Sequence, residues 1–184
     1  MSVLLNEDEY PNILVSDEND ENPRAVRFAK AIECGWNRRT VAVCLVDTHS
    51  TKVLLQKRSQ RVSIAPGTWS LAAAGHVDEG ESREETALKE LQEELGITAS
   101  SLQFLRKDLC EYPRSGDDAT RMRAWHAVYV VEYQGQKMRL EPTEVSEVAW
   151  FSIEDIDQML AENPGQFIGT FPKTWERIRD ILFT

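Results

Sequence analysis

The chain has 184 residues, enough for one domain with a buried core, and 41% of them are hydrophobic, which excludes a wholly disordered protein. The formal net charge of −10 argues against nonspecific binding to nucleic acid or to an anionic membrane. No apolar run is long enough to span a bilayer and the start of the chain lacks a signal-peptide pattern, so we expect a cytoplasmic protein. We also expect a monomer or a homodimer. The cysteines lack metal-site spacing and are expected to be reduced thiols: Cys34, Cys44 and Cys110.

The first part of the chain predicts an extension followed by a β-hairpin. Residues 1–33 are expected to form an N-terminal extension that packs on the core. Within it, the acidic stretch Ser16–Asn22 is expected to be a solvated turn, and Arg24–Ile32 has helical character. Thr40–Val46 and Lys52–Gln56 are rich in β-branched and aliphatic residues, so they predict two paired strands.

The strands of the second half are predicted by runs of apolar and β-branched residues. They lie at residues 69–74, 102–111, 123–133 and 148–151. The polar connection 114–120, with the sequence RSGDDAT, is expected to be mobile. Strands mixed with helices in this way predict an α/β fold in which helices cover both faces of a sheet.

Two helices are predicted after the last strand. Ser152 caps the first helix, which runs to about Ala161, and Asp155 occupies the capping-box position. The second helix covers about Pro172–Leu182. Its apolar residues recur at helical spacing and are expected to face the core: Trp175, Ile178, Ile181 and Leu182.

Residues 75–97, GHVDEGESREETALKELQEELGI, are the most informative part of the chain. Ser82 and Glu85 have the spacing of a capping box, and Gly96 stands where a left-handed residue ends a helix. Gly75 has no side chain, so its carbonyl oxygen can approach a bound ion. The segment therefore predicts a glycine-containing loop followed by a capped helix.

Three glutamates of this helix, Glu90, Glu93 and Glu94, fall on one face because steps of three and four residues return to the same side. One interpretation is an ordinary solvated helix face. The other is a cation site, because three close carboxylates repel one another unless positive charge lies among them. Hard divalent cations such as Mg²⁺ or Mn²⁺ take oxygen ligands of this kind.

The spacing of the segment resembles the Nudix box, in which a glycine and a glutamate precede the run Arg-Glu-apolar-any-Glu-Glu-any-Gly-apolar. The corresponding positions are Gly75, Glu81, Lys89, Glu90, Leu91, Glu93, Glu94, Gly96 and Ile97. Lys89 is the one departure, because the family has an arginine there, whose planar group can bind carboxylates through two hydrogen bonds. Lys89 can still pair with Glu93 four residues later, so we expect weakened or retuned activity rather than loss.

The resemblance implies a fold, a cofactor and a reaction. The fold is a single Nudix domain, residues 1–184, built as an α/β/α sandwich around a mixed β-sheet. The cofactor is Mg²⁺, or Mn²⁺, and its implied ligands are Gly75, Glu90, Glu93 and Glu94. The reaction is metal-assisted hydrolysis of a diphosphate linkage in a small molecule, such as a nucleoside diphosphate derivative.

Further residues are candidates for the remaining roles. The general base that takes a proton from water is Glu93 or Glu94 inside the box, or Glu144 outside it. The candidate substrate-binding residues are Arg39, Arg58, Trp69, His76 and Arg123. Other candidate cations for an anionic substrate are Arg38, Lys57, Arg61 and Arg121. Each has an alternative interpretation as a surface charge or a packed side chain.

A narrower resemblance links the segments VLLQKRS, PGTWSLAAAGH and EVSEVAWFSIEDI to the isopentenyl-diphosphate-isomerase-like branch of Nudix proteins, which contains isomerases and diphosphate hydrolases. The isomerases have a cysteine before the Gly-His pair, but Ala74 precedes Gly75 and His76 here and cannot transfer a proton. The later carboxylate pair of isomerases is also missing from residues 122–125. Hydrolysis is therefore the favoured reaction, with an isomerase and a noncatalytic ligand-binding Nudix domain as alternatives.

Overall fold

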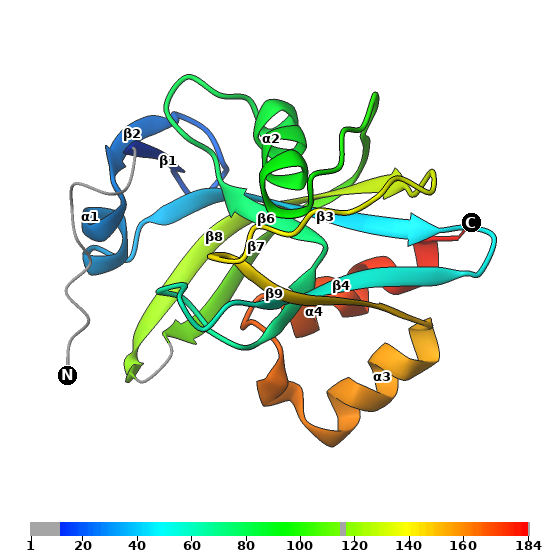
Figure 1. The fold of residues 1–184 in the computed structure, drawn as a ribbon. Helices are drawn as coiled ribbons and strands as arrows, with labels where there is room; N and C mark the ends of the chain where they lie inside the picture. The colour runs from blue at the N-terminus through cyan, green and yellow to red at the C-terminus, as the bar shows by residue number, and fades with distance from the viewer. Residues whose placement is uncertain (1–11, 115–116, 184) are drawn as a thin grey trace.

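The computed structural model describes residues 12–114 and 117–183 and shows a nine-stranded mixed sheet between helices (Figure 1). The strands are β1 (Asn12–Ser16), β2 (Arg24–Arg27), β3 (Asn37–Asp47), β4 (Lys52–Arg58), β5 (Trp69–Leu71), β6 (Ala73–His76), β7 (Gln103–Arg114), β8 (Asp117–Glu132) and β9 (Val145–Phe151). The helices are α1 (Phe28–Glu33), α2 (Arg83–Leu95), α3 (Ile153–Glu162) and α4 (Phe171–Ile178). Helix α2 covers one face of the sheet, and α3 and α4 cover the other. The predicted α/β fold with a mixed sheet is confirmed.

Strand β3 organises the sheet because both of its edges are paired. One edge pairs in parallel with β8 along residues 38–46. The other edge carries three antiparallel partners in succession: β1 at residues 37–38, β6 at residues 40–43 and β4 at residues 45–47. Since β6 and β4 follow each other along one edge, the sheet divides into two branches beside β3.

The two faces of β3 bury different clusters, because successive side chains of a strand point to opposite sides. Val41 and Val43 pack beneath α2 with Leu91. Ala42 and Cys44 belong to the cluster that α3 and α4 cover. Burial raises the pKa of the Cys44 thiol to about 12, so this cysteine is an unreactive part of the core.

The predicted hairpin is confirmed, because β3 and β4 pair antiparallel around the turn at residues 48–51. The segment predicted to be helical at Arg24–Ile32 divides in two instead. Its first four residues form β2, because Val26 pairs opposite Ile13 of β1, and helix α1 begins only at Phe28. The predicted strand at residues 69–74 is likewise two strands, β5 and β6, which belong to different branches of the sheet.

The C-terminal half follows the prediction more closely. Ser152 and Asp155 form the predicted capping box of α3. Helix α4 ends at Ile178 and continues as a short 3₁₀ turn, which leaves Ile181 43% exposed rather than in the core. The connection predicted to be mobile is mostly strand, since β7 extends to Arg114 and β8 begins at Asp117, with residues 115–116 outside the described part.

The described part of the N-terminal extension belongs to the sheet. Strands β1 and β2 form an antiparallel pair, and β1 also pairs with β3. Residues 1–11 of the extension lie outside the described residues. Across residues 12–114 and 117–183, no helix combines the length and apolar character needed to cross a bilayer.

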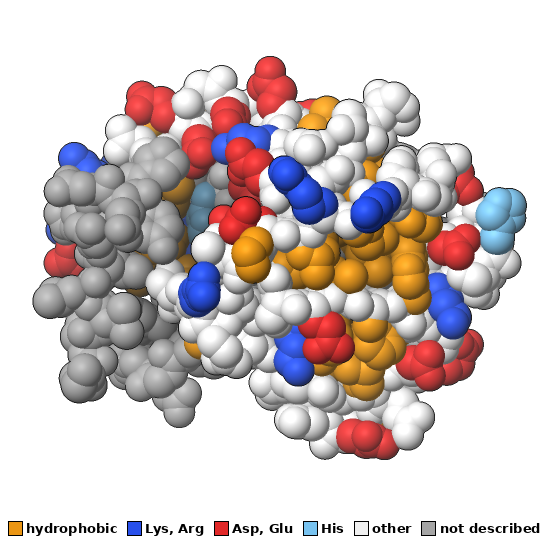
Figure 2. Space-filling model, in the orientation of Figure 1, with side chains coloured by type: hydrophobic (Ala, Val, Ile, Leu, Met, Phe, Trp, Pro, Cys, Tyr) orange, Lys and Arg blue, Asp and Glu red, His pale blue; other side chains and the backbone are white. Residues whose placement is uncertain are grey.

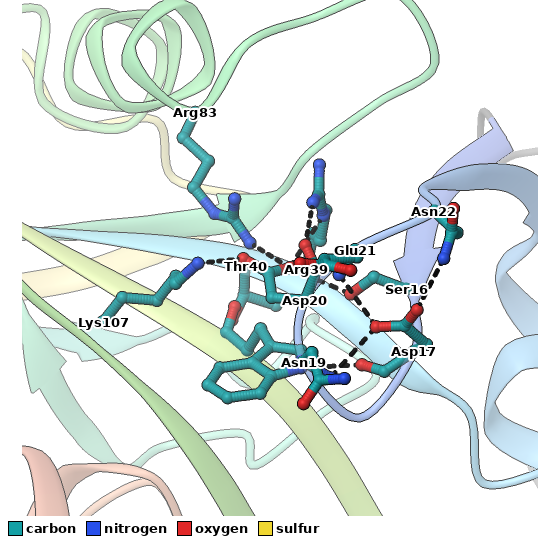
Figure 3. A network of polar contacts seen from close by, with 11 residues as sticks. Ser16, Asp17, Asn19, Asp20, Glu21, Asn22, Arg39, Thr40, Arg83 and Lys107 are labelled. Carbon is teal, nitrogen blue, oxygen red and sulfur yellow. Dashed lines mark hydrogen bonds and ion pairs between the residues drawn. The ribbon is translucent and has the colours of Figure 1, made fainter.

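The sequence predicted that the acidic turn Ser16–Asn22 is solvated, but the structure buries part of it. Asp20 is 6% exposed and has a left-handed backbone, with φ of +63°. Its carboxylate binds Arg39, Arg83 and Lys107, which come from β3, α2 and β7 (Figure 3). These ion pairs explain why an acidic residue is buried here, because its carboxylate pairs with three cations and ties the turn to the sheet and to α2.

Asp20 also makes stability depend on pH. Burial raises the pKa of the carboxyl group, but hydrogen bonds from Arg83 and Lys107 outweigh that effect and hold the pKa below its ordinary value of 3.8. Because the pKa is lowered in the folded state, the contribution of Asp20 to stability is complete above pH 3.8. It is lost as the pH falls through the lowered value.

We expect Asp20→Asn to lower the free energy of unfolding by about 3–5 kcal/mol at neutral pH, because three cations lose their counter-charge. Urea denaturation of both proteins at neutral pH and in steps below pH 3.8 measures the difference. The difference should narrow as the pH decreases. A difference that stays constant through the acidic range would contradict the assigned ion pairs.

Candidate active site

Gly75 of β6 and Glu90 of α2 are in direct apposition. A Cβ atom added to Gly75 would lie 1.9 Å from Oε1 of Glu90 and 2.2 Å from its Cδ. These distances are well inside van der Waals contact, so only glycine leaves room for the carboxylate in this position. The glycine at the start of residues 75–97 thus makes space for a glutamate of the helix that follows.

Both predicted caps of α2 are confirmed. The hydroxyl of Ser82 accepts a hydrogen bond from the backbone N–H of Glu85 at 3.2 Å, and the Glu85 carboxylate accepts one from the Ser82 N–H at 2.8 Å. Gly96 ends the helix in the left-handed conformation, with φ of +69°. The helix therefore includes Glu90 and Glu94, which lie about one turn apart on the same side.

Three carboxylates gather beside β6. The oxygens of Glu90, Glu94 and Glu144 that could act as ligands all lie within 4.8 Å of one another. Glu144 precedes β9, and its carbonyl oxygen accepts a hydrogen bond from the Ser59 N–H at 2.7 Å, which holds this segment near the end of β4. Glu93 is exposed and lines the same cavity without joining the cluster.

The cluster is short of positive charge. Burial and the nearby charge of Glu144 raise the pKa of Glu90 to about 8, and burial and the charge of Glu90 raise the pKa of Glu94 well above 4.5. Gln56 Nε2 donates to Glu94 Oε2 at 2.6 Å, whereas the buried Oε1 of Gln56 has no partner among the described residues. A site with more oxygen acceptors than donors fits a hard divalent cation, so these residues fit Mg²⁺ or Mn²⁺.

Lys89 does not form the predicted pair with Glu93. Its Nζ binds Asp78 at 2.9 Å and Glu81 at 2.8 Å, both in the loop between β6 and α2. Burial opposes the charged form of Lys89, but the hydrogen bonds to Glu81 and Asp78 raise its pKa, so the lysine stays protonated. Two acidic partners on the loop outcompete the single glutamate on the helix, and Lys89 therefore holds the loop against α2.

The carboxylate cluster forms part of the wall of a cavity of about 840 Å³, within the range of about 300–1,000 Å³ that small-molecule sites occupy. Leu71 of β5 and Ala74 of β6 both line the cavity. Since these strands belong to different branches of the sheet, the cavity lies where the branches separate. In Figure 2, acidic side chains gather over α2 and the loop before it, beside a recess in which histidine is visible.

Two of the five predicted substrate-binding residues, Arg58 and His76, line the cavity. The remaining three lie outside its wall: Arg39, Trp69 and Arg123. Their side chains bind or pack against Asp20, Phe151 and Glu18, respectively. Among the further candidate cations, Arg38 and Arg61 line the cavity, whereas Lys57 and Arg121 pair with acidic side chains elsewhere.

A second group of polar residues lines the wall, and among its members only Arg38 received a candidate role from the sequence. Arg38 Nη2 donates to the hydroxyl of Tyr112 at 2.7 Å, and Thr40 Oγ1 lies 2.9 Å from His126 Nδ1. The strand pairings bring them together, because β8 lies beside β3 and β7 lies beside β8. These residues are distant from one another in the sequence. The alternation of side chains between the two faces of each strand is the one sequence signal that could have indicated that they share a face.

His76 is held by Arg38, whose Nη1 lies 3.0 Å from His76 Nε2. Burial, followed by the charge of Arg38, lowers the pKa of His76 well below 6.5 and that of His126 to about 4. Both imidazoles are therefore neutral at neutral pH. Since the guanidinium can only donate, Nε2 of His76 accepts its hydrogen bond and is not available as a metal ligand.

Comparison with known proteins decides the family. The model of the NUDIX domain matches residues 36–171, which include the glycine, the acidic cluster and most of the sheet. The chain belongs to the Nudix family. The resemblance predicted from residues 75–97 is confirmed.

Curated relatives of this Nudix chain are hydrolases. It is 25% identical over 142 residues to the NAD-capped RNA hydrolase NudC of Pseudomonas putida, which covers 74% of this chain and 47% of NudC. The chain thus spans about half of the length of that relative. It is 29% identical over 143 residues to the Nudix hydrolase YfcD of Escherichia coli K12, which covers 78% of this chain and 74% of YfcD. Both relatives are named as hydrolases, in agreement with the family of this chain.

Solved structures share the fold of this Nudix chain. DR0079 from Deinococcus radiodurans superposes with a TM-score of 0.66 over 92% of this chain and 98% of that one, at 19% identity. The NUDIX domain of Shewanella oneidensis NrtR, solved with ADP ribose, has a TM-score of 0.58 and 25% identity and covers 78% of this chain and 87% of that one.

Gly75→Ala should displace Glu90 without unfolding the protein. The added methyl group would occupy the place of the carboxylate, whose flexible side chain can rotate away. We expect the affinity for Mn²⁺ to fall about 10- to 100-fold and the stability to fall by no more than about 1–3 kcal/mol. Calorimetric titration and thermal denaturation measure the two effects. Gly165→Ala, where the new Cβ meets only Asn163 at 3.4 Å, is the matched control, and unchanged affinity in Gly75→Ala would refute the site.

Proposed function

We propose that this chain is a divalent-cation-dependent hydrolase that cleaves the diphosphate linkage of a small organic molecule. The proposed ligands of Mg²⁺, or of Mn²⁺, are Glu90, Glu94, Glu144 and the carbonyl oxygen of Gly75. The observation that carries this proposal is the approach of three carboxylates to within 4.8 Å in the wall of a cavity. In the described ranges, no basic side chain forms an ion pair with any of the three.

We assign the other roles in the reaction to individual side chains of the cavity. When bound, the metal neutralises phosphate charge and makes water more acidic. Gln56 fixes the Glu94 carboxylate through its hydrogen bond to Oε2. Glu93 lines the cavity outside the carboxylate cluster, so we assign it as the general base, while Glu94 and Glu144, the other candidates, act as ligands. Arg58 supplies a cation in the wall for the anionic substrate.

A small diphosphate is a better match for this site than a nucleic acid or a membrane. The net charge of −10 repels polyanions, and the cations described in the cavity wall are few. NudC is named for NAD-capped RNA and the NrtR domain was solved with ADP ribose, which supports nucleotide-like diphosphates as a class for this family. We expect the protein to act in the cytoplasm, as a monomer or a homodimer.

The cavity favours hydrolysis over isomerisation. The likeness to the isopentenyl-diphosphate-isomerase-like branch stays an interpretation of sequence segments. Ala74 lines the cavity where the isomerases have a cysteine, and it carries no transferable proton. His76 beside it is bound to Arg38. No residue at this position can therefore move a proton on or off a carbon atom, as isomerisation requires.

A panel of diphosphates with Mg²⁺, with Mn²⁺ and with EDTA tests the proposal. The panel contains ADP-ribose, NADH, coenzyme A, UDP-glucose, a diadenosine polyphosphate, isopentenyl diphosphate and an NAD-capped RNA oligonucleotide, with products identified by mass spectrometry. We expect a phosphoanhydride bond of at least one small compound to be cleaved with metal and none with EDTA. Metal binding without turnover of any compound would favour a noncatalytic domain, and an isomer of isopentenyl diphosphate would favour an isomerase.

Two glutamine variants separate the metal ligands from the general base. Glu94→Gln should lower kcat at least about 100-fold and weaken Mn²⁺ binding. Without metal it should be no less stable than the native protein, because a buried charge is removed. Glu93→Gln should lower kcat while Mn²⁺ affinity is retained. Glu176→Gln, an exposed acid of α4, is the control, and equal losses in all three variants would count against the assignment.

A further inference from the structure

Arg38 is a buried cation in the wall of the cavity. The residue is only 2% exposed and comes from β3. In the described part of the chain it forms no ion pair, whereas Arg39 and Arg123 nearby each bind an acidic side chain. Taking a guanidinium out of water is unfavourable unless a counter-charge compensates it. Its place in a cavity wall points to a counter-charge brought by a ligand.

The surroundings of Arg38 hold the guanidinium in place with neutral acceptors. Nε donates to the carbonyl oxygen of Arg123 at 3.3 Å, Nη1 donates to His76 Nε2 at 3.0 Å and Nη2 donates to the Tyr112 hydroxyl at 2.7 Å. A guanidinium has five N–H donors, so two remain. The hydroxyl of Tyr112 accepts from Arg38 and therefore has its own proton to donate. These three N–H and O–H groups are therefore left to bind an anion.

Arg38 and the carboxylate cluster lie on opposite faces of β6. Gly75 and His76 are neighbours on this strand, so they point to opposite sides. Gly75 meets Glu90, whereas His76 meets Arg38. All four residues line the same cavity, which therefore extends around the strand from one face to the other. A phosphate bound through a cation at the cluster is thus a different group from an anion held by Arg38.

We propose that Arg38, positioned by His76 and Tyr112, binds a second anionic group of the substrate, a phosphate or a carboxylate, remote from the diphosphate that is cleaved. This inference rests on the proposed hydrolase function and narrows its substrate class to organic diphosphates that carry a further anion. Much of the remaining wall is apolar and suits the organic body of such a molecule: Ile13, Phe28, Ile64, Ile168 and Phe171. Because the guanidinium is only 2% exposed, its hydrogen bonds to an anion are stronger than they would be in water.

Matched substrate pairs test the proposal, because each pair shares the diphosphate and differs by one anion. Coenzyme A and 3′-dephospho-coenzyme A, and NADPH and NADH, differ by a phosphate. UDP-glucuronic acid and UDP-glucose differ by a carboxylate. We expect the native protein to prefer the anionic member of at least one pair by about 10- to 100-fold in kcat/KM, the effect of losing hydrogen bonds to a charged group. Hydrolysis without any such preference would overturn the proposal.

Variants of Arg38 show whether this residue causes the preference. Arg38→Gln should bring the ratio of the two kcat/KM values close to one, and Arg38→Lys should restore part of it. Tyr112→Phe should reduce this ratio of kcat/KM values by raising the KM for the anionic member. If circular dichroism shows that Arg38→Gln does not fold, Tyr112→Phe is the variant that tests the proposal. The control is Arg121→Gln, an exposed arginine paired with Glu111. An equal loss for both members of a pair would show a structural role only.

Binding of inorganic phosphate to the metal-free protein separates this proposal from the hydrolase function. In EDTA the carboxylate cluster repels phosphate, so phosphate can bind only at the cations of the wall. A phosphate effect that depends on Arg38, rather than on Arg58, identifies the Arg38 site. We expect phosphate to raise the melting temperature of the native protein and to broaden its own ³¹P signal, and both effects should disappear in Arg38→Gln or decrease in Tyr112→Phe. Equal effects in the native protein and these variants would overturn the Arg38 site, even if hydrolysis is observed. If no diphosphate is hydrolysed, the same measurement still decides the Arg38 site.

Discussion

The approach of Glu90, Glu94 and Glu144 is the constraint on which the site depends. Burial of the carboxylates and the repulsion between them are both unfavourable, and burial first and the charge of Glu144 second raise the pKa of Glu90 to about 8. Nothing in the cluster itself offsets these costs, so the surrounding fold must hold the acids together. Caps at both ends fix helix α2. Gly75 leaves room for the carboxylate of Glu90, and Gln56 donates a hydrogen bond to that of Glu94. The structure thus stabilises an arrangement that is unfavourable without a cation.

The division of the sheet beside β3 turns this cluster into a site with two faces. Because β6 and β4 share one edge of β3, their far ends separate, and the cavity lies between the branches. One face of β6 contacts α2 and the acids, and the other contacts Arg38. Arg38 and the carboxylate cluster therefore stand apart in one cavity, separated by a strand, instead of neutralising each other. A ligand that reaches both the carboxylate cluster and Arg38 can be selected by its charge at each of these two positions.

The sequence predicted best those features that depend on neighbours along the chain. The caps of α2 and α3 and the hairpin of β3 and β4 all follow from local spacing. Features that depend on distant partners were missed or misjudged. Lys89 binds two acids of the preceding loop rather than Glu93, and residues 24–27 form a strand because β1 lies beside them. The role of Gln56 and the burial of Asp20 also require a knowledge of which strands are adjacent.

The adjacent residues Arg38 and Arg39 show how the fold decides which cations of an acidic protein are paired with carboxylates. Alternation along β3 sends the two guanidinium groups to opposite sides of the strand. Asp20 lies on one side and binds Arg39, together with Arg83 and Lys107. The other side offers Arg38 only neutral acceptors. One buried carboxylate in an N-terminal turn therefore pairs with the cations that face it, whereas Arg38 has no acidic partner in the wall of the cavity among the described residues. A net charge of −10 thus coexists with a local site for an anion, because placement rather than number decides which cations can bind a ligand.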